Sequence, residues 1–242
     1  MFNPYELFIG LRYMRAKRRN HFISFISLTS VLGVALGVTA LITVLSVMNG
    51  FHKELTDRTL SMASHATVLE RNENLSNWRI IAEQVESHPE VAGVAPYFRA
   101  EGMLVNDKQV SGTIIRGILP EEEIKVSEIS EKIIEGELAN LKPGEFGIVL
   151  GKELSRSLHV LTGSKVTLVA PQANITPAGI LPRLKRFTVV GIFEVGMQEF
   201  DSALALIHLD DAQKLFRKTS PNGLRIKTTD IMRAPIISRE VM

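Results

Sequence analysis

The sequence predicts an α+β domain held on a membrane by one helix near the N-terminus. Three observations support this: an uncharged apolar run from Phe22 to Met48, a basic flank before it, and strand and helix patterns that interleave after it. The interleaving follows no strict β-α-β repeat, which favours α+β over α/β. We expect a cytoplasmic amphipathic segment in residues 1–21, a transmembrane helix in residues 22–50, and an external α+β domain in residues 51–242 with a long projecting loop in residues 171–186.

The apolar run is long enough to cross a bilayer. It holds 27 residues without a charge, and a bilayer core needs roughly 20 helical residues. A buried core helix is the alternative, but core helices are rarely apolar on every side over such a length. A cleaved signal peptide has a shorter apolar region with a small-residue site close behind it, whereas the nearest candidate here, Ser64-His65-Ala66, lies far beyond the run. We therefore expect an uncleaved anchor.

Charge predicts the orientation of this anchor. Residues 1–20 carry five basic residues and one acidic residue, which leaves 23 basic and 25 acidic residues for the rest. Excess Lys and Arg stay on the cytoplasmic side, so we expect the N-terminus inside and everything after Met48 outside. The rest of the chain has nearly equal numbers of basic and acidic residues, which gives no support for a basic surface that binds nucleic acid. The chain has no cysteine, so an external domain relies on its own core, as suits a bacterial envelope protein.

Small residues recur every four positions within the span, at Thr29, Gly33 and Gly37. This register lets two helix backbones approach closely, so it predicts a helix–helix contact; glycine is also simply common in membrane helices. Upstream, Asn3-Pro4 resembles the start of a short interfacial helix. Downstream, Asn49-Gly50 is a possible break, but the helical pattern continues, and we expect the helix to reach about Met62.

The external region mixes periods of two and 3.6 residues. Asn106-Asp107 is a candidate hairpin turn, and the acidic segment from Glu121 to Leu138 is expected to be helical in part. Strands are expected at Ala66–Leu69, Gly93–Tyr97, Gly102–Val105, Gln109–Ile118, Phe146–Leu150, Val166–Ala170, Phe187–Phe193, Leu204–His208 and Leu224–Lys227, and helices at Trp78–Val85, Gly151–Leu158 and Asp210–Phe216.

Motifs for catalysis are missing from the sequence. It contains no G-x-x-x-x-G-K-S/T, no H-E-x-x-H and no G-x-S-x-G. The six histidines are scattered without the spacing of metal ligands, and Glu121-Glu122-Glu123 has the character of a solvated charge run. We expect no enzymatic activity, no metal and no cofactor in this chain.

The segment from Pro171 to Arg186 is unusual for a connection between two strands. It is far longer than a tight turn needs, and it contains three prolines, which stiffen an extended loop by fixing φ. Apolar residues near its tip are costly unless a partner covers them, and its end is basic. An insertion without a role is the alternative to a binding loop.

Several stretches of the chain carry a resemblance to a known family: Leu7–Met14, Gly33–Leu41, Val44–Phe51, Pro96, Arg116-Gly117-Ile118, Ile148–Gly151 and Phe187–Phe193. Together they resemble the membrane subunits of lipoprotein-releasing ABC transporters of the LolC/LolE type, which have a MacB-like periplasmic core. The match covers the whole chain, is most specific in the first fifty residues, and leans toward LolC through Thr176-Pro-Ala-Gly-Ile-Leu-Pro182.

This resemblance implies a permease subunit in the bacterial inner membrane. Such subunits work with a cytoplasmic ABC ATPase and a second permease subunit, and pass lipoproteins from the membrane lipid to a periplasmic, LolA-like carrier. It implies that the lipoprotein contacts Val44, Val47, Met48 and Phe51, and that a hook binds the carrier. The implied hook residues are Ile175, Thr176, Pro177, Ala178, Gly179, Ile180, Leu181, Pro182 and Arg183.

One departure from the family is clear. The family has three further transmembrane helices after its external domain, and nothing after Met48 offers 18 uncharged apolar residues, so we expect a C-terminally truncated, N-terminal half. By the same comparison, we expect Leu224–Lys227 to be an edge strand or a poorly covered strand, and residues 232–242 to have little to pack against. The rival functions are a membrane-anchored periplasmic binding or scaffolding module, as in efflux-type or cell-division permeases, and an anchored enzyme.

Overall fold

The computed structural model describes residues 5, 8–10, 12, 21–62, 64–69, 75–176 and 179–241. They fall into two compact units, Met1–Leu55 and Thr56–Met242. Most of the expected cytoplasmic segment in residues 1–21, including the helix start at Asn3-Pro4, lies outside the described residues.

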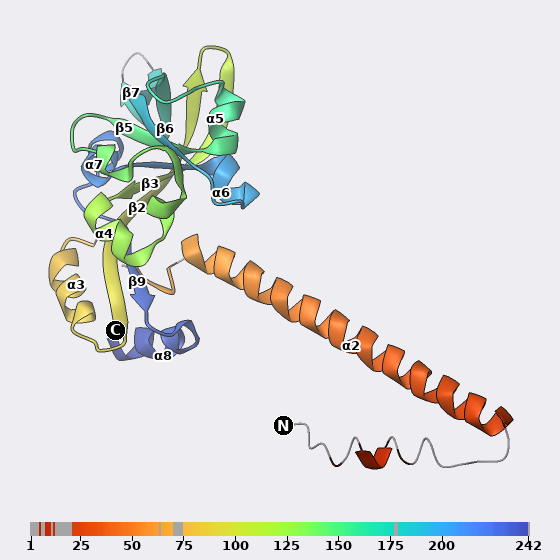
Figure 1. Ribbon diagram of the computed structural model, residues 1–242. Coiled ribbons are helices and arrows are strands. Elements are labelled where there is room, and N and C mark those ends of the chain that lie inside the picture. The colour runs from red at the N-terminus through yellow and green to blue at the C-terminus, as the bar shows by residue number, and fades with distance from the viewer. Residues whose placement is uncertain are drawn as a thin grey trace. The chain divides into compact units, whose positions relative to one another are not determined.

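Helix α2 runs from His21 to Met62 without interruption (Figure 1). The prediction that it continues through Asn49-Gly50 is confirmed. Its part Phe25–His52 has 28 residues and a mean hydropathy of 2.4, enough to span a membrane by length and composition. The hydroxyl of Thr29 donates to the carbonyl oxygens of Phe25 and Ile26, 3.1 and 3.0 Å away, so this side chain is satisfied within its own helix, as a lipid environment requires.

The second unit is a mixed α+β domain, which confirms the predicted fold class. Its strands are β1 (Ala66–Leu69), β2 (Val91–Asn106), β3 (Gln109–Ile118), β4 (Ile133–Gly136), β5 (Gly147–Gly151), β6 (Lys165–Thr176), β7 (Gly179–Phe193), β8 (Leu204–His208) and β9 (Gly223–Thr228). Its helices are α3 (Trp78–Glu86), α4 (Pro120–Val126), α5 (Lys152–Leu158), α6 (Gln198–Ala203), α7 (Leu209–Phe216) and α8 (Ala234–Val241), with 3₁₀ turns η1 (Ile129–Lys132), η2 (Leu138–Asn140) and η3 (Ile231–Arg233).

The strands close into a ring. β6 pairs with β7 on one side and with β2 on the other, so that β2, β3, β8, β5, β7 and β6 follow one another around the ring. Alternate side chains of these strands face inward and form the main core, which includes Leu104, Ile115, Leu168 and Phe187. A second apolar cluster, which includes Ile118 and Val149, lies on the opposite face of β3, β5, β7 and β8. The first half of β2 leaves the ring and pairs with β9, and β9 pairs with β1.

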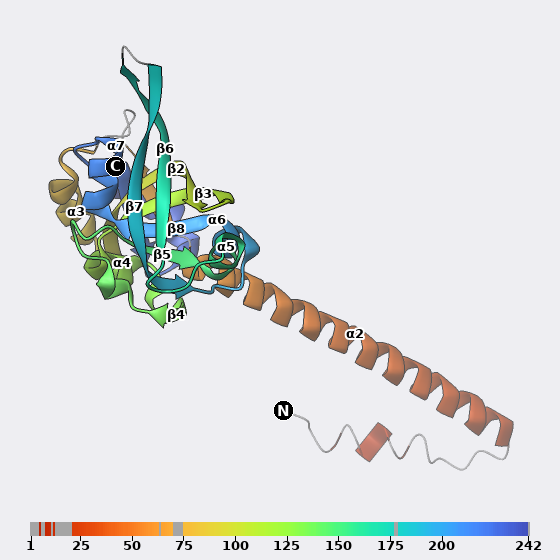
Figure 2. The same cartoon turned by 90° about the horizontal axis from the view of Figure 1, so that it is seen from above.

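The structure differs from the sequence predictions at β2 and in the segment 171–186. Gly93–Tyr97 and Gly102–Val105 are parts of one strand, β2. The expected loop 171–186 is instead the outer part of β6 and β7, and only two residues separate these strands. Pro171 lies in a register shift between Ala170 and Ala173, and prolines are tolerated at such irregular positions. Pro171 and Pro182 therefore lie within strands, and the hairpin projects from the body of the domain (Figure 2).

The expectation that β9 is an edge strand is wrong. β9 lies between β1 and β2, and five of its six residues are buried. The expectation that residues 232–242 lack packing is also wrong, because Ala234 and Ile237 of α8 are buried. The ring nitrogen Nε2 of His88 lies 3.2 Å from a carboxylate oxygen of Glu240, and Arg233 pairs with Glu90. The short strand β1 covers the open side of β9, a long-range pairing that local sequence patterns do not reveal.

Candidate functional site

The projecting hairpin contains the predicted hook. Beyond the register shift, β6 and β7 pair from Ala173 opposite Pro182 to Thr176 opposite Gly179. This places Ile175 opposite Ile180, so the backbone register brings two apolar residues together near the tip. Pro177 and Ala178 lie outside the described residues. The remaining hook residues predicted from sequence therefore sit on one two-stranded element, on which paired backbones replace the expected proline-stiffened loop.

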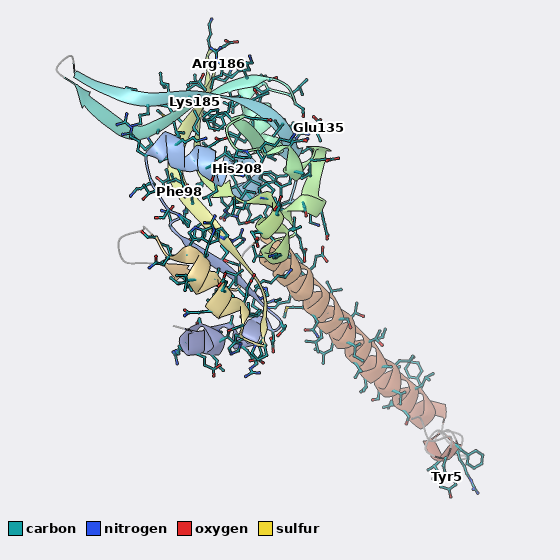
Figure 3. The ribbon with its side chains drawn as sticks, turned by 90° about the vertical axis from the view of Figure 1, so that its left-hand side faces the viewer. Tyr5, Phe98, Glu135, Lys185, Arg186 and His208 are labelled. Atoms are coloured by element: carbon teal, nitrogen blue, oxygen red, sulfur yellow. The ribbon has the colours of Figure 1, made fainter. Side chains whose placement is uncertain are left out.

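The base of the hairpin is fastened to the domain by named contacts. A guanidinium nitrogen of Arg183 donates to the carbonyl oxygen of Leu215 in α7, 3.4 Å away. The ammonium group of Lys185 lies 3.6 Å from the centre of the Phe146 ring, a cation–π arrangement. Phe146 in turn packs edge-on against the buried Phe187, with ring centres 5.6 Å apart. Figure 3 shows Lys185 on this part of β7. The fixed base holds the projecting strands in a defined direction.

A shallow hollow of about 510 Å³ opens at this base; we call it the basal hollow. Four of its lining residues are cationic and none is acidic, while Phe146, Pro182, Leu184 and Leu215 supply apolar surface. A protein surface that combines apolar area with carboxylates would complement it. The cationic residues of the basal hollow are Arg183, Lys185, Lys214 and Arg217.

An apolar row continues from the basal hollow across the outside of the ring. Leu184 of β7 is opposite Val169 of β6, and Val169 is opposite Met103 of β2. Leu184 is 60% exposed and Met103 is 47% exposed. On the next hairpin, Val105 is opposite Val110, which is 60% exposed. Exposed apolar side chains that adjoin one another are typical of contact surfaces.

The second predicted site lies on α2. Val44, Val47, Met48 and Phe51 are all exposed in the described chain. Val44, Met48 and Phe51 are spaced i, i+4, i+7, which places them on one face of the helix.

The small-residue positions occupy the same helix nearer its start. At Gly33 and Gly37 an added Cβ would meet nothing within 4 Å in the described part of the chain. The hydroxyl of Thr29 is hydrogen-bonded within α2. A packing seam for another helix at Thr29, Gly33 and Gly37 stays a prediction.

Sequence reasoning missed the surfaces around the hook. Lys185 was recognised as part of a basic end, but its contact with Phe146 was not. Met103 and Val110 were read as ordinary strand residues, because their neighbourhood with Leu184 depends on the pairing of β6 with β2, more than 60 positions apart in the sequence. No group of metal-binding side chains is found in the described ranges.

Comparison with known proteins gives a consistent picture. Residues 27–241 match the family model of the MacB-like periplasmic core domain. The chain is 47% identical over 241 residues to the lipoprotein-releasing system transmembrane protein LolC of Xylella fastidiosa (strain 9a5c), covering 100% of this chain and 58% of that protein. It is 45% identical over 234 residues to LolC of Neisseria meningitidis serogroup B, covering 96% of this chain and 56% of that protein.

More distant likenesses extend the same comparison. The chain is 29% identical over 229 residues to the lipoprotein-releasing system transmembrane protein LolE of Haemophilus influenzae, covering 92% of this chain and 55% of that protein. Among solved structures, the extracellular domain of the noncanonic ABC-type transporter YknZ from Gram-positive bacteria has a TM-score of 0.49 at 10% identity, covering 72% of this chain and 87% of that chain. The chain thus spans less than two thirds of the length of these LolC and LolE relatives.

Proposed function

We propose, from the premise that this chain belongs to the family of MacB-like periplasmic core domains, that it is the N-terminal part of a LolC-type permease that releases lipoproteins from a membrane. The projecting hairpin is the observation that supports this most strongly. It offers an apolar pair near its tip, a fastened base and a cationic hollow beside it. A partner that takes up released cargo outside the membrane needs such a docking element.

The partners follow from the same proposal. A periplasmic carrier of the LolA type docks on the hairpin and on the basal hollow. A separate cytoplasmic ABC ATPase supplies the energy, and a second permease subunit packs on α2 at Thr29, Gly33 and Gly37. The basic flank supports an N-terminus in the cytoplasm and a domain in the periplasm of a bacterial inner membrane.

The lipoprotein itself is assigned to the outer end of the membrane helix. Val44, Val47, Met48 and Phe51 combine large apolar side chains with high exposure, so they can contact acyl chains as these leave the bilayer. Along the chain, these residues come at the end of the apolar span and before the domain to which we assign carrier binding. Transfer of the cargo is therefore expected to start at this face of α2.

Photo-crosslinking of the assembled transporter tests this assignment. A crosslinking residue at position 44, 48 or 51 should capture lipoprotein, and the yield should fall when ATP drives release. Ile42 is the matched control, because it is equally exposed but lies about 160–180° around the helix from positions 44 and 51. Equal capture at position 42, or capture of neighbouring helices alone at positions 44, 48 and 51, would contradict the lipid assignment.

A further inference from the structure

Two arginines face each other on the outside of the ring. Arg99 of β2 and Arg116 of β3 are direct partners across the antiparallel pair. Their sequence neighbours Phe98 and Ile115 are buried in the inner core, so the two arginines project from the opposite, outer face. Directly opposed side chains have Cβ atoms about 4.5–5.5 Å apart, and like charges in this arrangement are destabilising.

Nearby groups leave this positive charge unbalanced. A third arginine, Arg225 of β9, is buried and paired with the buried Glu123 of α4. Burial, together with the charges of Arg225 and Arg99, lowers the pKa of Arg116 to about 10, although Glu123 acts in the opposite direction. Glu101 is the next acidic residue along this face of β2, and it lies in no ion pair within 4 Å among the described residues.

Two buried aspartates in the domain are held by backbone hydrogen bonds. Asp211 accepts hydrogen bonds from the backbone N–H groups of Gly144 and Phe146. Asp201 likewise accepts two from backbone N–H groups. The Arg99–Arg116 pair is different, because in the described part of the chain neither guanidinium is in an ion pair. Arg99 is exposed, and Arg116 is half-buried by residue surface although burial dominates the lowering of its pKa, so an incoming anion meets Arg99 first.

We propose that Arg99 and Arg116 form a clamp for one carboxylate, presented by an acidic side chain of the protein that docks on the hairpin. A guanidinium fork matches the two oxygens of a carboxylate and binds it in bidentate fashion. One carboxylate between the two forks turns a like-charge repulsion into two charge-assisted contacts. In the neighbouring position Arg225 already pairs with one oxygen of the Glu123 carboxylate, and the other oxygen has no hydrogen-bond partner among the described residues.

Position on the surface connects the clamp to the hairpin. Arg99 lies four residues from Met103 on the same face of β2, which is about 13 Å along a strand. Met103 belongs to the apolar row that leads to Leu184 and the basal hollow. A protein interface of ordinary size buries about 800 Å² on each partner, so one partner can cover the hollow, the row and the clamp together. The cationic hollow and the arginine clamp both require acidic groups on that partner.

The first test uses acetate as a free carboxylate. Full-length chain in a non-ionic detergent is heated at pH 7 in acetate or in chloride of equal ionic strength. Acetate at ten times its dissociation constant should raise the unfolding midpoint by about 3–6 °C over chloride, and Arg99→Gln and Arg116→Gln should each remove this rise. The matched control is Arg156→Gln, which alters an arginine of α5 that pairs with Glu153 and should keep it. An equal effect of acetate and chloride, or a rise that survives in the Arg99→Gln, Arg116→Gln double variant, overturns the clamp.

The second test separates a protein-borne carboxylate from a free one. The inference rests on the proposed function for the identity of the docking protein, so the purified carrier is titrated against the full chain. Arg99→Gln and Arg116→Gln should each weaken carrier binding about tenfold or more, and Arg116→Lys should restore part of it because it keeps the charge but not the fork.

Outcomes of the second test are distinct. If both glutamine variants bind the carrier with unchanged affinity while removal of the hairpin abolishes binding, the proposal that a carboxylate of the carrier binds the clamp is wrong. The proposed function is then unaffected. Unchanged affinity on removal of the hairpin instead contradicts the proposed function itself.

Discussion

At the scale of single residues, two buried aspartates fix loops by accepting backbone hydrogen bonds. Asp211 of α7 holds the N–H groups of Gly144 and Phe146 at 2.8 and 3.1 Å. It thereby positions Phe146, whose ring meets Lys185 at the base of the hairpin. One buried carboxylate thus connects the helix α7, the loop before β5 and the floor of the basal hollow.

Removal of this carboxylate should be costly. Asp211→Ala leaves two backbone donors without a partner, and we expect the free energy of unfolding to fall by about 2–4 kcal/mol. Asp210→Ala is the matched control, since Asp210 is the exposed neighbour in the same first turn of α7, and should cost less than about 1 kcal/mol. Urea unfolding of the full chain in detergent measures both. Similar losses for the two variants would show that the hydrogen bonds of Asp211 contribute little.

A histidine at the start of β1 gives the domain a dependence on pH. Burial lowers the pKa of His65 below its ordinary value, and this effect together with the nearby Lys227 outweighs a backbone hydrogen bond with Thr228 that raises the pKa. The N–H of Thr228 donates to Nδ1 of His65 at 3.1 Å, which requires that nitrogen to be unprotonated. The neutral ring is therefore the form that the folded state accepts.

The sign of this dependence follows from the lowered pKa. The unfolded chain takes up a proton at a pH of about 6.5, before the folded chain does. The stability contributed by neutral His65 is therefore present above pH 6.5 and is lost as the pH falls below it. We expect the drop in unfolding free energy between pH 7.5 and 5.5 to be smaller in His65→Gln than in the unaltered chain. An identical drop in both proteins would assign the pH dependence to other groups.

At the scale of elements, β9 is better supported than its sequence indicates. Both of its edges are paired, with β1 and β2, whereas β4 pairs only with β7 and exposes three of its four residues. We expect the backbone amides of β9 to exchange with solvent at least about tenfold more slowly than those of β4, because local opening is easier at an exposed edge. Hydrogen exchange of the full chain measures this. Exchange of β9 as fast as that of β4 would mean that β1 does not hold its edge.

Local patterns were sufficient for elements whose signal lies within their own sequence. The bounds of β8 and the end of α2 at Met62 agree with expectation, because alternation and helical spacing are local properties. Elements that depend on distant partners were not predictable in this way. The interior place of β9 requires β1, and the extension of β6 and β7 past Pro171 requires a register shift that absorbs the proline.

The candidate site divides in the same manner. The hook residues from Ile175 to Arg183 were found because prolines and apolar residues in a long connection are unusual on their own. The Arg99–Arg116 pair and the apolar row through Met103 were not, because each is assembled from strands that meet only in the folded ring. The alternation of residues along one strand does not reveal which other strands become its neighbours, so it does not predict a surface that several strands form together.

At the scale of the whole molecule, two functions are assigned to two units. The helix α2 contains a stretch long and apolar enough to cross a membrane, and the lipid-binding face and the packing seam are proposed for this helix. The domain from Thr56 onward supplies a closed ring from which a hairpin projects. The proposed function needs both, because cargo leaves the membrane at the first and is received by a carrier at the second.

Binding of the purified LolA-type carrier to the full chain in detergent tests this account most directly. Residues 174–181 are replaced by Asn-Gly, a two-residue turn that joins the paired positions Ala173 and Pro182. The matched control replaces Asp107-Lys108, the turn between β2 and β3, by the same two residues. The account predicts that the first change raises the dissociation constant about 100-fold or more while the unfolding midpoint stays within about 2 °C, and that the control changes neither. Carrier affinity within about threefold of the unaltered chain after loss of the hairpin, in a protein that remains folded, would contradict it.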